Sequence, residues 1–208
     1  MDTKENILLT ALRLFAKNGF EAVSVSRIAG ELGMVKSALY KHYKSKRDIF
    51  DCILERMDAM DIERAKKYEM PEGDMEKVVT AYRKLPFEQI RTYSEAQFRH
   101  WTQEEFPSLF RKMLTLEQFR SQEMNELYQK YLTSSPVTYM KEIFRGMTGD
   151  ERTAEQLALE FYGPIYLLYS LYDGAADKEA VTALMNTHVE RFSDSLKRSL
   201  EQGVMQDE

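Results

Sequence analysis

Long apolar runs and cysteines are almost absent from this chain of 208 residues. The longest unbroken apolar run covers residues 165–169, whereas a helix needs about 20 such residues to cross a bilayer. A transmembrane protein is therefore excluded, and the charged first residues do not form a secretory signal. The single cysteine, Cys52, leaves no intrachain disulfide and no cysteine-rich zinc site. These absences predict a cytoplasmic protein, because a reducing compartment suits such a chain.

Acidic side chains are missing from one segment of an otherwise acidic protein. The net charge is −5, yet residues 1–50 contain nine Lys or Arg and only five Asp or Glu. Between residues 36 and 47 there are five basic side chains and no acidic one. A basic segment on an acidic body indicates a local contact with a polyanion. The alternative is that these charges are only solvated surface.

Helical signals run along the whole chain, and strand signals are scarce. Asp2 and Glu5 have the spacing of a capping box at the start of a first helix, which Gly19 ends. Ser24 is a natural cap for a second helix, and Ser45 for a fourth. Two long helices, about 153–172 and 178–202, close the chain. The predicted fold is all-α, with an N-terminal unit of three to four helices at 1–50 and a larger helical body at 51–208. The fourth helix, 46–68, links the two.

Two short helices that meet at Gly33 have the sequence form of a helix-turn-helix. The turn reverses sharply, and glycine can take the positive φ that a side chain would penalise. The first helix must approach the second closely, which favours the small Ala29. The predicted scaffold of the motif consists of Ile28, Ala29, Leu32, Gly33 and Leu39.

The strings NGFEAVSV at 18–25, RIA at 27–29, LYKHY at 39–43 and KSKRDIF at 44–50, together with Gly33, resemble the TetR family of bacterial transcriptional regulators. The resemblance covers about the first 55 residues. It implies a homodimer that offers one recognition helix per subunit to double-stranded DNA. It also implies a C-terminal domain, used for regulation and dimerisation, that senses a small molecule and then loosens DNA binding.

The same resemblance implies which residues contact DNA. Lys36 and Ser37 open the recognition helix, and the whole implied set is Ser24, Lys36, Ser37, Tyr40, Lys41, His42 and Lys46. The family's usual inward phenylalanine is Tyr43 here, which we expect in the core. Val35 and Ala38 depart from the family pattern, because hydroxyl side chains are frequent at both positions. Tyr40 and His42 have a simpler alternative role, which is to cover the surface of a small helical unit.

Nineteen of the 24 aromatic side chains follow residue 67. Aromatic side chains suit the lining of a ligand pocket, although at helical spacing they are more often core. A hydrophobic or aromatic effector is therefore predicted, with His100 or Glu117 as polar partners. The predicted lining consists of Phe98, Trp101, Met113, Phe119, Met124 and Tyr128.

The last two helices carry apolar stripes that call for cover on both sides. The resemblance implies that they pair with their symmetry mates in a twofold dimer. The residues predicted at this interface are Tyr162, Tyr166, Tyr169, Leu184, His188 and Phe192.

No motif of catalysis or metal binding occurs, so we predict no enzyme, no cofactor and no metal site. His100, Glu104 and Glu105 are close in sequence, but such a group is usually only surface. The predicted function is a ligand-responsive DNA-binding regulator, a repressor released by a small hydrophobic or aromatic effector. The alternatives are a helical small-molecule-binding protein that no longer reads DNA and, less favoured, an all-α enzyme.

Overall fold

The computed structural model describes residues 2–204, and these residues form eleven α-helices and no strand. The all-α fold expected from the sequence is confirmed. The chain divides into two compact units, each made of two segments. Unit 1 comprises residues 1–64 and 103–128, and unit 2 comprises residues 65–102 and 129–208. Within the described residues no helix is long and apolar enough to cross a membrane.

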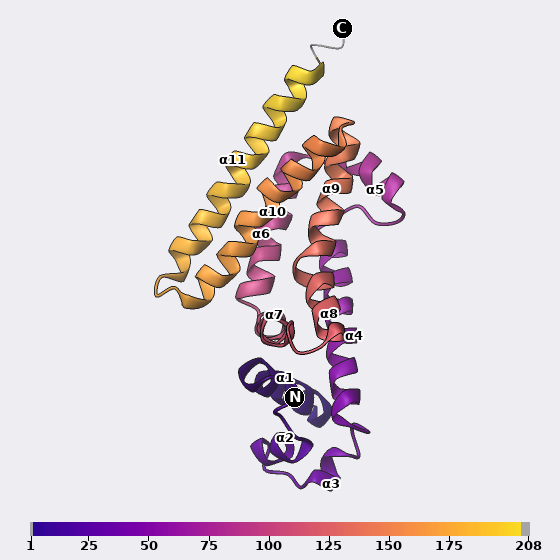
Figure 1. Ribbon diagram of the computed structural model, residues 1–208, viewed down its shortest axis with the longest axis vertical. Coiled ribbons are helices and arrows are strands. Elements are labelled where there is room, and N and C mark those ends of the chain that lie inside the picture. The colour runs from indigo at the N-terminus through magenta and orange to yellow at the C-terminus, as the bar shows by residue number, and fades with distance from the viewer. Residues whose placement is uncertain (1, 205–208) are drawn as a thin grey trace. The chain divides into compact units, whose positions relative to one another are not determined.

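Unit 1 contains the N-terminal helices together with a later helix of the chain. In Figure 1, α7 (Glu105–Glu117) lies on one side of α1 (Thr3–Asn18), and α2 (Val25–Glu31) and α3 (Lys36–Leu39) lie on its other side. The unit also includes α4 (Lys46–Lys67) as far as residue 64 and the first part of α8 (Gln122–Leu132). Every helix predicted for residues 1–68 is present. The recognition helix, however, is only four residues long.

Aromatic packing holds the core of unit 1 together. The Phe20 ring lies 5.1 Å from the Phe15 ring and 4.9 Å from the Phe50 ring, so three segments meet at one side chain. The predicted capping box at the start of α1 is wrong. The Asp2 side chain makes no cap hydrogen bond, and the Glu5 carboxylate pairs with Arg56 of α4 instead. Glu5, which the local sequence pattern assigns to the cap of α1, therefore forms a tertiary ion pair instead.

Unit 2 contains α5 (Met75–Tyr82), α6 (Phe87–Thr102), α9 (Ser134–Thr148), α10 (Glu151–Gly174) and α11 (Lys178–Val204). Helices α10 and α11 form an antiparallel pair, with α6 and α9 packed against it (Figure 1). A cluster of rings from three helices fills the space between them, with centroid distances of 5.0 to 6.4 Å. Its members are Phe144, Phe161, His188 and Phe192.

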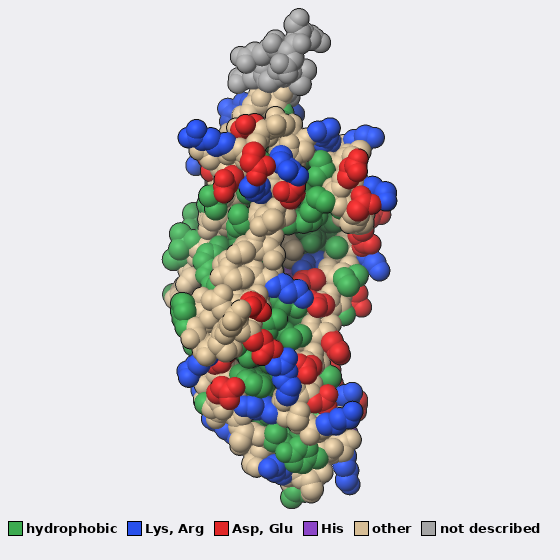
Figure 2. All heavy atoms as spheres, turned by 45° about the vertical axis from the view of Figure 1, so that its right-hand side comes forward, with side chains coloured by type: hydrophobic (Ala, Val, Ile, Leu, Met, Phe, Trp, Pro, Cys, Tyr) green, Lys and Arg blue, Asp and Glu red, His purple; other side chains and the backbone are tan. Residues whose placement is uncertain are grey.

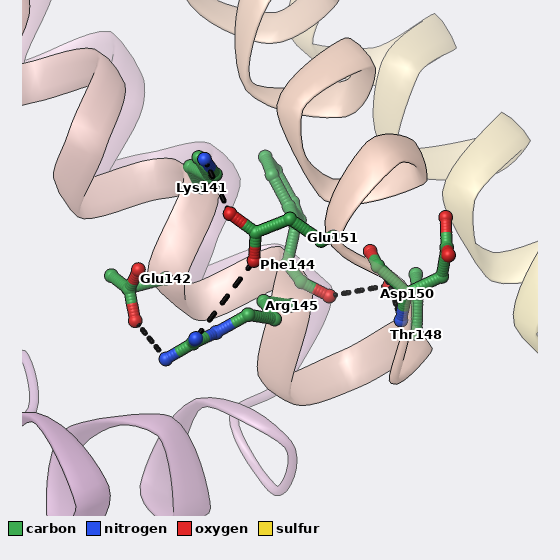
Figure 3. A network of polar contacts seen from close by, with 7 residues as sticks. All are labelled: Lys141, Glu142, Phe144, Arg145, Thr148, Asp150 and Glu151. Carbon is green, nitrogen blue, oxygen red and sulfur yellow. Dashed lines mark hydrogen bonds and ion pairs between the residues drawn. The ribbon is translucent and has the colours of Figure 1, made fainter.

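A polar network with the ion pairs of Arg145 and Glu151 holds the corner between α9 and α10 (Figure 3). Gly149 ends α9 with a φ of +72°, and the Asp150 carboxylate caps α10 by accepting from the Thr153 amide at 2.7 Å. The Glu151 carboxylate lies 2.6 Å from Lys141 Nζ, and this contact lowers the pKa of Glu151. Such exposed ion pairs add little to the stability of the fold. Their role here is to orient α10 relative to α9.

Gly146 of α9 lets α5 approach closely. A Cβ atom built on Gly146 would lie 1.9 Å from a methyl carbon of Val79. The Arg83 guanidinium also donates to the carbonyl oxygen of Gly146, with its Nε atom at 2.7 Å. The absence of a side chain at this position therefore fixes how α5 lies on α9.

The two units are defined by packing, and they do not coincide with the predicted division at residue 50. The predicted domains, 1–50 for DNA reading and 51–208 for ligand binding and dimerisation, are functional assignments, and they stay predictions.

Candidate nucleic-acid interface

The turn between α2 and α3 closes through backbone hydrogen bonds. The Met34 amide donates to the carbonyl oxygen of Ala29 at 3.0 Å, and the Gly33 amide donates to that of Gly30 at 3.0 Å. This pair of bonds is a Schellman motif, which needs a left-handed residue just after the helix. Gly33 supplies it with a φ of +64°. The predicted role of Gly33 as the hinge of the turn therefore has a geometric cause.

The apolar side of the motif is closed off from water. Ile28, Ala29 and Leu39 are buried, and Leu32 is half-buried at the end of α2. Burial of an isoleucine or leucine side chain, such as Ile28 or Leu39, stabilises the fold by roughly 1.5–3 kcal/mol. The short α3, with a single turn of its own, is thus held in place by packing rather than by helix propensity.

The opposite side of the motif is polar and exposed. The side chains of Lys36, Ser37, Tyr40, Lys41 and His42 all lie in solvent. The Lys36 ammonium lies 5.6 Å from the centre of the Tyr40 ring, so the two present one charged and hydrogen-bonding surface. Figure 2 shows basic and apolar side chains at the end formed by α2 and α3, where acidic ones are scarce on the face in view.

The start of α3 has no side-chain cap. Val35 occupies the N-cap position with extended backbone angles, makes no cap hydrogen bond and is largely exposed. The first amide groups of α3 therefore receive no hydrogen bond from the N-cap side chain.

The start of α2, in contrast, is capped. The Ser24 hydroxyl accepts a hydrogen bond from the Arg27 amide at 3.2 Å, as the sequence predicts for an N-cap. The Arg27 guanidinium donates to the side-chain oxygen of Asn18 at 3.1 Å. Ser24 is exposed, so its hydroxyl can serve the cap and still face an outside group.

Lys46 is engaged inside the protein. Its ammonium donates to the carbonyl oxygen of Phe20 at 2.8 Å and lies 4.1 Å from the centre of the Phe20 ring. A longer contact of 3.4 Å reaches the Glu21 carbonyl. Lys46 therefore ties the start of α4 to the loop that precedes α2. Sequence reasoning gave it only a phosphate role, because a loop carbonyl leaves no mark in a sequence pattern.

Two further contacts fix the start of α4. Tyr43 is buried, as expected, and its hydroxyl donates to the carbonyl oxygen of Lys4 at 3.1 Å. Burial raises the pKa of Tyr43 above its usual range. The Arg47 guanidinium lies 2.6 Å from the Glu123 carboxylate and 2.7 Å from the Asp51 carboxylate. The hydrogen bond to Glu123 is the main cause of the raised pKa of Arg47.

A buried carboxylate lies against the loop before α2. Glu117 ends α7, is 1% exposed, and neither of its carboxylate oxygens has a hydrogen-bond partner in the described residues. A Cβ atom built on Gly19 would lie 2.4 Å from one of these oxygens. The nearest cation is the exposed Arg120, with its Nε atom at 3.7 Å. Gly19 and Glu117 thus form a tight contact between α7 and the helix-turn-helix, one that the sequence did not indicate.

The predicted effector-lining residues are distributed over both units. Phe98 and Trp101 are buried in unit 2, and Met113, Met124 and Tyr128 are buried in unit 1. Phe119 is 88% exposed at the end of α7. Of the suggested polar partners, His100 and Glu117 are both buried, in units 2 and 1 respectively. The lining set stays a prediction.

The residues predicted at a dimer interface differ in their exposure. Tyr166 and Leu184 are exposed. Tyr169 is buried against Phe98, with the rings stacked at 5.7 Å. The other three make contacts inside unit 2: the Tyr162 hydroxyl donates to the Leu132 carbonyl, and His188 and Phe192 belong to the ring cluster.

No group of three or more His, Cys, Asp or Glu side chains that could hold a metal ion occurs among residues 2–204. A short exposed helix on a buried scaffold, joined by a glycine turn, defines the class of helix-turn-helix proteins. The comparison with known sequences gives a family match for the N-terminal segment. Residues 7–53 match the sequence profile described as bacterial regulatory proteins, tetR family.

Two relatives illustrate this match. The uncharacterized regulator YerO of Bacillus subtilis is 40% identical over 68 residues, which are 33% of this chain and 24% of YerO. The tetracycline repressor protein class C of Escherichia coli is 39% identical over 54 residues, 26% of this chain and 25% of the repressor. The chain therefore matches only about a quarter of each relative's length.

The whole fold is shared with solved structures. A TetR-family transcriptional regulator from Bordetella parapertussis superposes with a TM-score of 0.62 at 18% identity, over 92% of this chain and 94% of that one. Residues 7–53 thus match the tetR family of bacterial regulatory proteins, and the chain shares the fold of that solved regulator.

Proposed function

We propose that this chain is a homodimeric transcriptional regulator that represses genes at a near-palindromic operator and is released by a small hydrophobic or aromatic effector. The observation that carries the proposal is the exposed polar side of α3, which lies on the buried side chains of Ile28, Ala29 and Leu39. Lys36, Ser37, Tyr40, Lys41 and His42 are all exposed, whereas Ile28 and Leu39 behind them are closed off from water.

In this proposal α3 enters a major groove, whose width of about 12 Å admits one helix. Lys36 and Ser37 reach base edges, whereas Ser24, Tyr40 and His42 contact phosphates. Two such helices in a dimer are separated by about 34 Å or somewhat more, which sets the spacing of the half-sites. The effector weakens DNA binding by preferring a conformation in which this spacing is wrong.

An apolar surface on α10 and α11 supports the dimer. Four exposed apolar side chains lie within one half of the circumference of α10, and a fifth is exposed on α11: Leu159, Tyr166, Leu167, Leu171 and Leu184. Contiguous exposed apolar side chains mark interaction sites in soluble proteins. Sedimentation should give a dimer at micromolar concentration and a monomer for Leu167→Glu. A monomeric wild type contradicts this part of the proposal.

Repression is inferred from a relative. The Escherichia coli protein that matches the N-terminal segment is named a tetracycline repressor. We infer the same mode of action here, with an effector of different chemistry, because the match does not extend into the C-terminal part.

Selection from a pool of random duplexes tests the proposal. The purified protein should enrich one near-palindromic sequence, and its affinity should fall steeply with salt because phosphate contacts release counterions. Added cell metabolites should lower this affinity. A protein that binds no duplex at low ionic strength contradicts the proposal as a whole.

One observation favours a second candidate. Val35 leaves α3 without a side-chain cap and cannot hydrogen-bond to DNA. The chain would then be a small-molecule-binding protein that has lost sequence reading. Salt-dependent binding to random DNA without any enriched sequence would favour this alternative.

A further inference from the structure

The inward stripe of α4 changes from apolar to charged along its length. Ile53 and Met57 are both fully buried. Arg64 follows seven residues after Met57, which returns it to the same side of a helix with 3.6 residues per turn. Arg64 is itself only 8% exposed. A guanidinium therefore occupies a position at which an apolar side chain would continue the stripe.

Most of this guanidinium lacks a hydrogen-bond partner. Its Nη2 atom pairs with the Asp61 carboxylate one turn earlier on α4. Its Nε and Nη1 atoms are closed off from solvent, and neither has an acceptor among the residues that the structure describes. An arginine side chain keeps its charge in proteins. Buried N–H groups of a charged side chain that lack acceptors lower the stability of the fold.

Asp61 orients Arg64 without satisfying it. The Asp61 side chain is 34% exposed, so water screens part of its charge, whereas the Arg64 side chain is 7% exposed. The half-exposed Asp61 carboxylate thus balances only part of the buried positive charge of Arg64. The two nitrogens without acceptors, Nε and Nη1, can donate charge-assisted hydrogen bonds to an anionic group.

We propose that Arg64 binds the carboxylate of an amphipathic effector, a molecule with an apolar body and one anionic end. A carboxylate offers only acceptors, and its hydrogen bonds to arginine are charge-assisted. The apolar body is proposed because the same side of α4 is apolar before Arg64, at Ile53 and Met57. This inference rests on the proposed function, since it names the chemical class of the effector that the regulator senses.

Matched probes separate charge from hydrophobicity. The full-length protein is titrated with decanoate, decanol and decyltrimethylammonium, and with the rigid pair naphthoate and naphthylmethanol, and binding is followed by calorimetry and thermal unfolding. We expect at least one carboxylate to bind about tenfold or more tightly than its neutral partner. Arg64→Met should abolish this preference, and Arg64→Lys should retain part of it. If neither carboxylate is preferred, or if Arg64→Met keeps the preference, the inference is wrong.

A second measurement needs no ligand. Arg64→Met should raise the midpoint of thermal unfolding of the ligand-free protein, because an apolar side chain of similar length replaces a charge without partners. Arg56→Met on the same helix is the matched control. Arg56 pairs with Glu5 and lies 4.4 Å from the centre of the Phe106 ring, so its loss should lower the midpoint. A lowered midpoint for Arg64→Met would assign Arg64 a structural role and overturn the inference.

DNA binding by the ligand-free protein separates this inference from the proposed function. A wild type that binds an operator but shows no preference for carboxylates refutes the anionic effector alone. A wild type that binds carboxylates through Arg64 but no duplex refutes the DNA-binding regulator and leaves a carboxylate-binding protein.

Discussion

The ammonium of Lys46 and the carbonyl oxygen of Phe20 lie 2.8 Å apart and form a hydrogen bond. Phe20 in turn packs between Phe15 and Phe50, the latter on the same helix as Lys46. The start of α4 and the loop before α2 are therefore joined by a hydrogen bond and by ring packing. Lys46, which is expected to contact phosphate, also holds the loop before α2 in place. Its substitution should therefore have two separable effects.

Lys46→Ala should weaken binding to every duplex and flatten the slope of log affinity against log salt by about one. It should also lower the midpoint of thermal unfolding, because the Phe20 carbonyl loses its charged donor. A salt titration and a melting curve measure the two effects. Lys44→Ala is the control, since the Lys44 side chain is exposed. An unchanged slope with a lowered midpoint would leave Lys46 with the loop role alone.

Gly19→Ala should destabilise the protein by about 2 kcal/mol or more, because the new Cβ adds a clash to a backbone with a φ of +85°. In a Glu117→Ala background the steric part disappears, and the cost should fall to about 1 kcal/mol. Gly33→Ala is the matched control, since its φ is +64° and no atom lies within 4 Å of the added Cβ. Equal costs for Gly19→Ala in both backgrounds, measured by urea unfolding, would show that Glu117 does not restrict this position.

Gly146→Ala should destabilise unit 2, although alanine is the better helix former by about 1 kcal/mol. The reason is the clash with Val79, which forces α5 away from α9. Gly30→Ala, at a helical position with no atom within 4 Å, should instead stabilise the protein slightly. The Val79→Ala background should turn the effect of Gly146→Ala from unfavourable to neutral or favourable. Chemical denaturation of the four variants and the wild type tests the reversal.

Tyr40→Phe should reduce affinity for all sequences alike, because a phosphate contact carries no base information. Lys36→Ala and Ser37→Ala should instead change the preferred bases, since these side chains open the recognition helix. Selection from random duplexes distinguishes the two behaviours. An unaltered consensus for both Lys36→Ala and Ser37→Ala would remove them from base reading.

Tyr43→Phe should make the folded protein less sensitive to alkaline pH. Burial raises the pKa of Tyr43, so the folded state favours the neutral phenol more than the unfolded chain does. The stability that this preference contributes is complete below pH about 10, the unfolded value, and is lost as the pH rises further. Urea unfolding at neutral and alkaline pH should show a smaller loss for Tyr43→Phe than for the wild type. At neutral pH the variant should lose about 1 kcal/mol with the hydrogen bond to Lys4.

The helix-turn-helix could be predicted from the sequence because its signals are local. Ser24 caps α2 and Gly33 forms the turn through contacts with residues at most five positions away. The ends of the long helices were predicted less well. The sequence placed the break at Asp173 and Gly174, whereas α10 includes both and ends before Ala175. Helix ends depend on the packing of the next segment, which a local pattern does not contain.

The inward position of Arg64, and the contact that Glu117 makes with Gly19, could not be assigned from the sequence. Glu117 follows the buried Met113 and Leu114 on α7, and Arg64 follows the buried Met57 on α4. A charge on an apolar stripe was the available signal. It was not decisive, because long charged side chains at such positions often reach water by bending outward.

The sequence alone determined the all-α class, the helix-turn-helix and the resemblance of its segment to the TetR family, because capping, glycine turns and apolar periodicity act within a few residues. Only the tertiary structure decided that Lys46 anchors a loop, that Gly19 accommodates Glu117 and that Arg64 lies buried with two nitrogens unsatisfied. These relationships join residues far apart in the chain, or depend on which side of a helix is covered. The energies of these contacts depend on the distances between the groups and on their removal from water, and both are set only when the chain is packed.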